Sequence, residues 1–168
     1  MRVVADLPHQ ARKVPMAAVT FKKLSRGLVI ALAAVAALVG YNINFPAGRS
    51  SASNWKFVAA HPALLLHVIV AVAIVVMAII MLVMSIRSRN PYWIILSAAG
   101  LAFVLLAFAS GSDYVTTLRR SADDYMGAGW SGAILTYGTG WYLARKTAQR
   151  DMAPATGQRN SFSSSRQR

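Results

Sequence analysis

Four long stretches of the sequence contain no Asp, Glu, Lys or Arg, and they limit what this chain can fold into. They run over residues 27–48, 57–86, 90–112 and 125–144. Each is long enough to cross a bilayer as a helix, which needs about 20 apolar residues. The second stretch contains the run ALLLHVIVAVAIVVMAIIMLVM, which is apolar on every side apart from one His, whereas a surface helix of a soluble bundle keeps a polar face. We therefore expect an all-α integral membrane protein.

The turn-forming residues predict where the helices begin and end. We expect four transmembrane helices over about residues 25–45, 62–86, 91–110 and 125–144, packed as an antiparallel bundle in a domain of residues 25–144. Pro62 and Pro91 suit the first turn of a helix, where a missing N–H costs nothing. Residues 47–56 are rich in Gly and Ser and predict a linker, and Gly111 is expected to end the third helix before a polar loop.

The two flanking segments are polar and basic. Residues 1–24 are expected to be disordered or to lie along the membrane surface, and residues 145–168 to form a disordered basic tail. A cleavable signal peptide is a competing interpretation of the N-terminal segment, because basic residues precede an apolar run. The long leader and the lack of a small-x-small site after that run favour an uncleaved first helix.

The distribution of charge predicts the orientation. The formal net charge is +13, from 18 Lys and Arg against five acidic residues. If both termini are cytoplasmic, fourteen of the 18 basic residues lie inside, as the positive-inside rule requires. We therefore expect a multi-pass protein of the bacterial inner membrane, with the lipid bilayer as its main partner and no nucleic acid bound. Aromatic residues at the helix ends fit this layout as membrane-interface anchors, namely Trp55, Trp93, Trp141 and Tyr142.

Small residues recur every four positions along the last apolar stretch, at Ala128, Gly132, Thr136 and Gly140. Such a pattern lets two helices approach closely. It predicts close packing within the bundle or, alternatively, a docking face for another subunit or a flat cofactor.

Two His residues stand at the start of the second apolar stretch. His61 and His67 are six positions apart, about 240° around a helix, so they cannot hold one metal ion together. His61 is expected at the interface. His67 lies deeper, where an ionisable group is a candidate functional residue, although a neutral His bonded to a neighbouring polar group is the simpler interpretation. Asp113 and Asp124 could join either His in a cation site, or belong to a solvated loop.

The segment AHPALLLH resembles the start of the second helix in small, uncharacterised four-helix bacterial membrane proteins with a His-Pro-x(4)-His pattern, and also membrane haem-b bundles. The second resemblance implies a haem b with His67 as an axial ligand. Because no other apolar stretch contains His, two His ligands from one chain are excluded. A single His, a pair of His67 with Met126, or a site shared between chains remains open.

No sequence motif of a known enzyme class occurs, and the absence of Cys excludes disulfides and thiolate-held clusters. We therefore predict a non-catalytic membrane protein, an accessory or scaffold subunit of a membrane assembly that associates with other membrane subunits or with copies of itself. The alternatives are a haem- or metal-binding electron-transfer module that uses His67, and a small oligomeric transporter.

Overall fold

The computed structural model describes residues 16–39 and 50–152. This part of the chain contains five helices and no strand, which confirms the all-α prediction there. The helices are α1 (Met16–Val39), α2 (Ser51–Ala60), α3 (Pro62–Arg87), α4 (Pro91–Thr117) and α5 (Arg120–Met152). Of these, α3 and α4 are long and apolar enough to cross a membrane.

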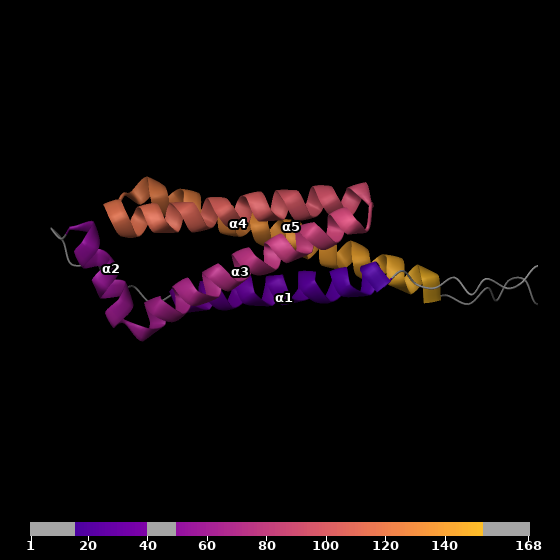
Figure 1. Cartoon of the computed structure of the whole chain (residues 1–168), viewed down its shortest axis with the longest axis horizontal. Coiled ribbons are helices and arrows are strands. Elements are labelled where there is room, and N and C mark those ends of the chain that lie inside the picture. Colours follow the sequence, from indigo (N-terminus) through magenta and orange to yellow (C-terminus); the bar gives the residue numbers. More distant parts are fainter. Residues whose placement is uncertain (1–15, 40–49, 153–168) are drawn as a thin grey trace, which may run out of the picture.

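The four long helices form one bundle (Figure 1). Helix α1 packs against α3 and α5, and α4 packs against the same two helices, so the four make a closed ring. The short helix α2 lies at one end of the bundle, against α3 and α4. We call this the α2 end. The opposite end holds the first residues of α1, the turn between α3 and α4, and the last residues of α5 (Figure 1). We call it the basic end, because its described charged side chains are all basic: Lys22, Lys23, Arg26, Arg87, Arg89, Arg145 and Lys146.

The buried residues follow alternating steps of three and four along α1, α3 and α4. In α3 they are Ile74, Ala78, Met81 and Ser85. In α1 they are Phe21, Ser25, Leu28, Leu32 and Val35. This spacing places one narrow stripe of each helix toward its neighbours. The hydroxyls of Ser85 and Ser97 lie 2.7 Å apart and join α3 to α4 within this core.

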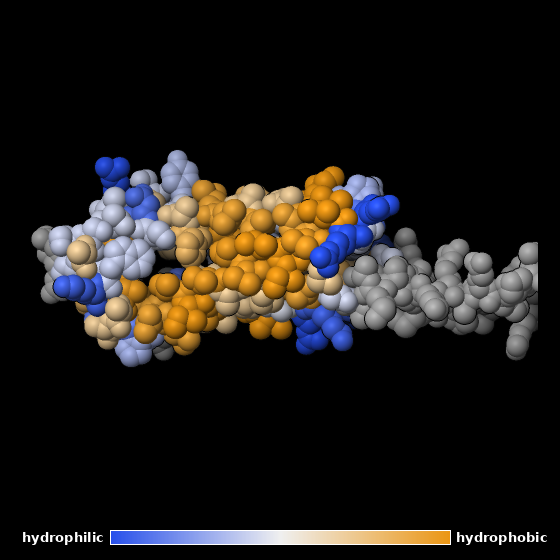
Figure 2. All heavy atoms as spheres, viewed as in Figure 1, coloured by the Kyte–Doolittle hydropathy of each residue, from blue (hydrophilic) through white to orange (hydrophobic). Residues whose placement is uncertain are grey.

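The outer surface of the bundle is apolar. Only 22% of the most apolar window of α3 and 17% of that of α4 are buried, although a core helix of a soluble protein would be covered. Their exposed side chains are large and aliphatic or aromatic, among them Ile69, Val76, Ile80, Ile95 and Leu105. Figure 2 shows these residues as a wide apolar zone between two charged ends. An exposed surface of this kind needs an apolar surrounding.

The predicted linker over residues 47–56 is wrong from Ser51 onward, because these residues form helix α2. Ser50 acts as the N-cap, and its side chain accepts a hydrogen bond from the Ser53 amide. Asn54 is buried, and its amide donates to the Val115 carbonyl of α4 at 2.9 Å. A cap and one tertiary hydrogen bond therefore outweigh the low helix propensity of Ser and Asn.

The predicted end of the third helix at Ser110 and the predicted start of the fourth at Tyr125 are also wrong. Helix α4 continues through Gly111 to Thr117, and α5 begins at Arg120, so the connection shrinks to Leu118 and Arg119. Hydroxyl groups of Ser112, Thr116 and Thr117 donate to carbonyls one turn back, so these polar side chains are satisfied within the helix. The chain reverses at Leu118, whose φ of 54° is left-handed.

The remaining boundaries differ in the same direction. Helix α1 begins at Met16, inside the segment expected to be disordered or interfacial, and α5 extends to Met152, inside the expected tail. Both extensions are helix-forming sequences without Gly or Pro, so the edge of the apolar stretch does not end the helix. By contrast, α3 and the start of α4 match the prediction. Residues 40–45 of the first predicted helix, residues 1–15 and residues 153–168 lie outside the described part.

Candidate functional site: a cavity at the α2 end

A cavity of about 600 Å³ lies at the α2 end of the bundle. All five helices contribute to its wall. Most of the lining is aliphatic, including Leu32, Val35, Leu64, Val68, Ile74 and Val104. The volume falls in the range of about 300–1,000 Å³ that is typical of small-molecule sites.

The cavity lies where α3 and α4, which meet at the basic end, diverge toward the α2 end (Figure 1). The buried residues of α3 begin at Ile74, and those of α4 end at Val104. Beyond these positions, toward the α2 end, neither helix has a fully buried residue. Helix α2 covers part of this region, with Val58 buried and Asn54 bonded to α4.

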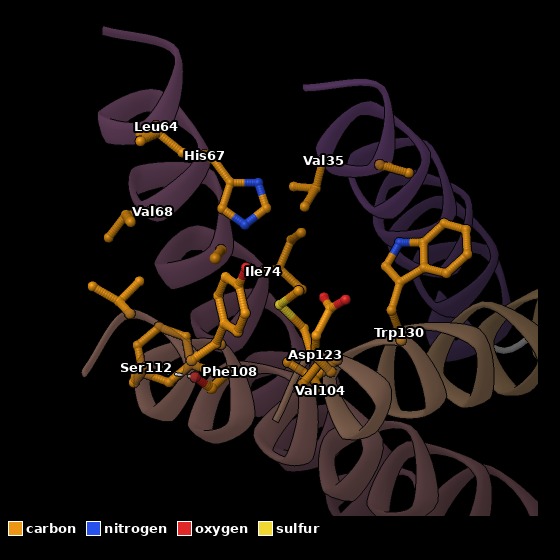
Figure 3. Close-up of a pocket in the computed structure, with 18 of the residues that line it drawn as sticks. Val35, Leu64, His67, Val68, Ile74, Val104, Phe108, Ser112, Asp123 and Trp130 are labelled. Atoms are coloured by element: carbon orange, nitrogen blue, oxygen red, sulfur yellow. Dashed lines mark hydrogen bonds between the residues drawn. The ribbon is translucent and has the colours of Figure 1, made fainter. Parts of the chain in front are cut away.

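The side chains of His67 and Asp123 face each other across the cavity. Figure 3 shows His67 reaching in from α3 and the Asp123 carboxylate reaching in from the first turn of α5. The His67 Nδ1 atom is buried and has no hydrogen-bond partner among the described residues. Asp123 is the one charged residue in the described lining. The site therefore combines apolar walls with one carboxylate and one unpaired ring nitrogen.

Four aromatic residues complete the lining: Trp55, Phe108, Tyr114 and Trp130. The Trp130 indole donates to the Leu32 carbonyl at 2.9 Å, which ties α5 to α1 beside the cavity. The Ser112 hydroxyl, also in the lining, donates to the Phe108 carbonyl at 3.0 Å. Two of the hydrogen-bond donors of the wall are thus already used within the protein.

The predicted site residues do not all meet at this cavity. His67 lines it, together with Met126. His61 is exposed at the junction of α2 and α3, where its Nδ1 lies 2.7 Å from the Phe57 carbonyl and its ring stacks on Phe57 at 3.8 Å. Asp113 and Asp124 are exposed and belong to helices rather than to a loop. Among the described residues, no group of three or more His, Asp or Glu could hold a metal ion.

The stripe Ala128, Gly132, Thr136 and Gly140 does not form one packed face. Gly132 lies under the Phe103 ring of α4, and Gly140 lies beside Phe21 of α1, whereas Ala128 is exposed. The Thr136 hydroxyl donates to the Gly132 carbonyl within α5. A step of four residues turns about 400° in an α-helix, so the stripe drifts around the helix. Gly129, Ala133, Tyr137 and Gly140 make the buried line instead.

The expected interface anchors divide into exposed and packed residues. Tyr142 is 62% exposed at the basic end and Trp55 is 38% exposed at the α2 end, as anchors require. Trp93 instead packs against Phe21, with ring centroids 4.2 Å apart, and Trp141 is half-buried. Trp93 therefore joins α4 to α1.

No protein-family model, curated protein or solved structure matches this chain. The sequence interpretation missed Asp123 and Trp130 as site residues. The available signal for Asp123 was its position before the fourth apolar stretch, but Asp124 shares that position. Only the rotation of α5 distinguishes the two carboxylates.

Proposed function

We propose that this chain is a non-catalytic, four-span protein of the bacterial inner membrane that holds an apolar small molecule in the cavity at its α2 end. In this proposal it acts as an accessory or binding subunit of a membrane assembly. The single observation that carries the proposal is the 600 Å³ cavity in a bundle whose outer surface is apolar.

The four-span topology is supported by the charges at the two ends. The basic end carries only Lys and Arg among its described charged side chains, whereas the α2 end carries both signs: Lys56, Arg119, Arg120, Asp113, Asp123 and Asp124. The basic end is therefore the side that the positive-inside rule assigns to the cytoplasm. The first residues of α1 and the last residues of α5 both lie at that end (Figure 1).

Helices α1 and α5 are proposed as the other two spans, although their composition is less apolar. Helix α1 carries Lys22, Lys23 and Arg26 near its start, and the uncharged part of α5 is rich in Gly, Ser and Thr. Helix α1 packs against α3 and α5, and α5 packs against α4 and α1, so both lie beside the two apolar helices and would share their environment. Small and weakly polar residues are common where membrane helices pack together.

The binding role is tested by filling the cavity. Ala71 lines it, whereas Ala73, on the same helix, is exposed and outside the described lining. The test uses a variant that keeps Trp130 as its one tryptophan, in lipid nanodiscs, with the quencher 1-bromonaphthalene as an apolar probe. We expect saturable quenching that Ala71→Phe abolishes and Ala73→Phe preserves. Equal quenching in both variants would contradict the proposal.

Haem binding is a second candidate, favoured because His67 and Met126 line the same cavity. His67 and Met126 would serve as the two axial ligands of the haem iron, since His with Met is an established ligand set. A bound haem would supply one-electron transfer, and the chain would contribute the two ligands and the apolar surrounding. Protein produced with ample haem should then show a Soret band that His67→Leu removes. Colourless protein would exclude this candidate and leave the apolar-ligand proposal intact.

A further inference from the structure

The side chains of the cavity wall favour a ligand that carries a charge as well as an apolar body. Resting on the proposed binding function, we propose that the cavity takes a lipophilic organic cation, a molecule with an apolar body and one positive charge, whose charge lies beside the Asp123 carboxylate. The proposal combines three features of the wall: one carboxylate, aromatic neighbours, and few free hydrogen-bond donors.

The first feature is the sign of the charge. Asp123 is exposed, as Asp124 is, but its carboxylate reaches into the cavity (Figure 3) and it is the one charged residue in the described lining. The basic residues of the same end, Lys56, Arg119 and Arg120, are exposed and are not part of that lining. A ligand in the cavity therefore meets one carboxylate in the wall, whereas solvent screens the charges of the three exposed basic side chains.

The second feature is the aromatic share of the wall. Trp55, Phe108, Tyr114 and Trp130 line the same space as Asp123. Aromatic rings attract cations through their electron-rich faces, and this attraction grows when the site is shielded from water. An aliphatic wall alone would hold the apolar body of a ligand but give its charge no support.

The third feature is the balance of donors and acceptors. The Trp130 indole and the Ser112 hydroxyl both donate to backbone carbonyls. An anionic ligand needs several free N–H or O–H groups, and these two donors of the wall are already used. A cation needs acceptors, which the Asp123 carboxylate and an imidazole nitrogen of His67 provide.

The test uses the full chain in lipid nanodiscs with tetraphenylphosphonium as the cation and tetraphenylborate as an anion of the same shape. Binding is measured as saturable uptake above that of empty nanodiscs. We expect tetraphenylphosphonium to bind at least ten times more tightly than tetraphenylborate. Asp123→Asn should weaken the cation at least tenfold, and Asp123→Glu, which keeps the charge, should restore most of the affinity.

Asp124→Asn is the matched control. It removes the same charge from the next residue of α5, which is exposed and outside the described lining. It should change the affinity no more than about twofold, the effect of altered surface potential. Equal loss in both variants, or equal binding of the two ions, would overturn the inference.

The neutral probe separates the two proposals. If 1-bromonaphthalene binds in an Ala71-dependent way but the cation shows no preference, the cavity is an apolar site and the charge inference is wrong. If neither probe binds, the proposed binding function itself fails. Each variant is first checked for an unchanged elution profile, and Asp123→Glu supplies the decisive comparison if Asp123→Asn does not fold.

Discussion

Among the described glycines, Gly129 is the one at which an added Cβ atom would meet the backbone of another helix. A Cβ atom on Gly129 would lie 2.6 Å from the Ala107 nitrogen and 2.8 Å from the Phe103 carbonyl oxygen, both backbone atoms of α4. We therefore expect Gly129→Ala to force α4 and α5 apart and to lower the free energy of unfolding by about 1–3 kcal/mol, the usual cost of overpacking. Unfolding in mixed micelles with increasing SDS measures this change.

The control for that prediction lies two residues away. A Cβ atom on Gly127 would meet nothing within 4 Å. Gly127→Ala should therefore leave stability unchanged or raise it by up to about 1 kcal/mol through helix propensity. A loss of stability in the Gly127 variant equal to that in the Gly129 variant would show that the helix contact does not set the effect.

The indole of Trp130 provides the one described side-chain hydrogen bond between α5 and α1. Trp130→Phe keeps an aromatic ring but removes the donor to the Leu32 carbonyl. We expect a loss of about 0.5–1 kcal/mol in the same SDS titration, since hydrogen bonds between membrane helices contribute modestly. Trp141→Phe, where the structure describes no indole hydrogen bond, should lose less. The opposite order of the two variants would contradict this role.

At the scale of whole elements, the accuracy of the sequence prediction depended on what ended each helix. Helix α3 was predicted almost to the residue, because Pro62 begins it and the turn at Ser88–Asn90 follows it. Helices α1, α4 and α5 were predicted from the edges of apolar stretches. Those edges mark where a segment is apolar enough to lie in hydrocarbon. A helix can extend beyond them into water as long as its backbone hydrogen bonds are satisfied.

Helix α2 and the cavity could not be predicted in this way. The helix depends on Asn54 meeting the Val115 carbonyl, a contact across 61 positions of the sequence. The cavity depends on how far apart α3 and α4 stand beyond Ile74 and Val104, which no local pattern encodes. His67 was a candidate because an ionisable group in an apolar stretch is unusual by itself. Asp123 lines the cavity only because of the rotation of α5 about its own axis, which the sequence does not reveal.

The anchoring of α2 is therefore a testable property of one side chain. Asn54→Ala removes the hydrogen bond that this side chain donates to the Val115 carbonyl, one of the last carbonyls of α4. We expect faster hydrogen exchange across residues 51–60 with little change in α3 and α4. The reason is that α2 is held to the bundle more weakly than the four long helices are held to one another. Lys56→Ala, at an exposed position of the same helix, should not change exchange there. Equal protection in the two variants would mean that Asn54 does not hold α2 in place.

The whole molecule has a basic half, in which all four long helices pack together, and an open half at the α2 end, in which α3 stands apart from α4 (Figure 1). The basic half contains the Ser85–Ser97 pair and the ring contact of Phe21 with Trp93. The open half contains the cavity, its carboxylate and its covering helix. In the proposed orientation the open half faces away from the cytoplasm, so a ligand would reach it from the outer leaflet or the outer aqueous phase.

That orientation gives a prediction for the intact protein. The chain has no Cys, so single substitutions allow labelling without background. We expect Lys56→Cys and Asp124→Cys to react in intact cells with a maleimide that cannot cross the membrane, and Arg89→Cys to react only after the cells are permeabilised. All three positions are exposed, so access to the thiol should not limit the reaction. Labelling of Arg89→Cys alone in intact cells would indicate the opposite orientation. Labelling of all three variants there would mean that the bundle does not span the membrane.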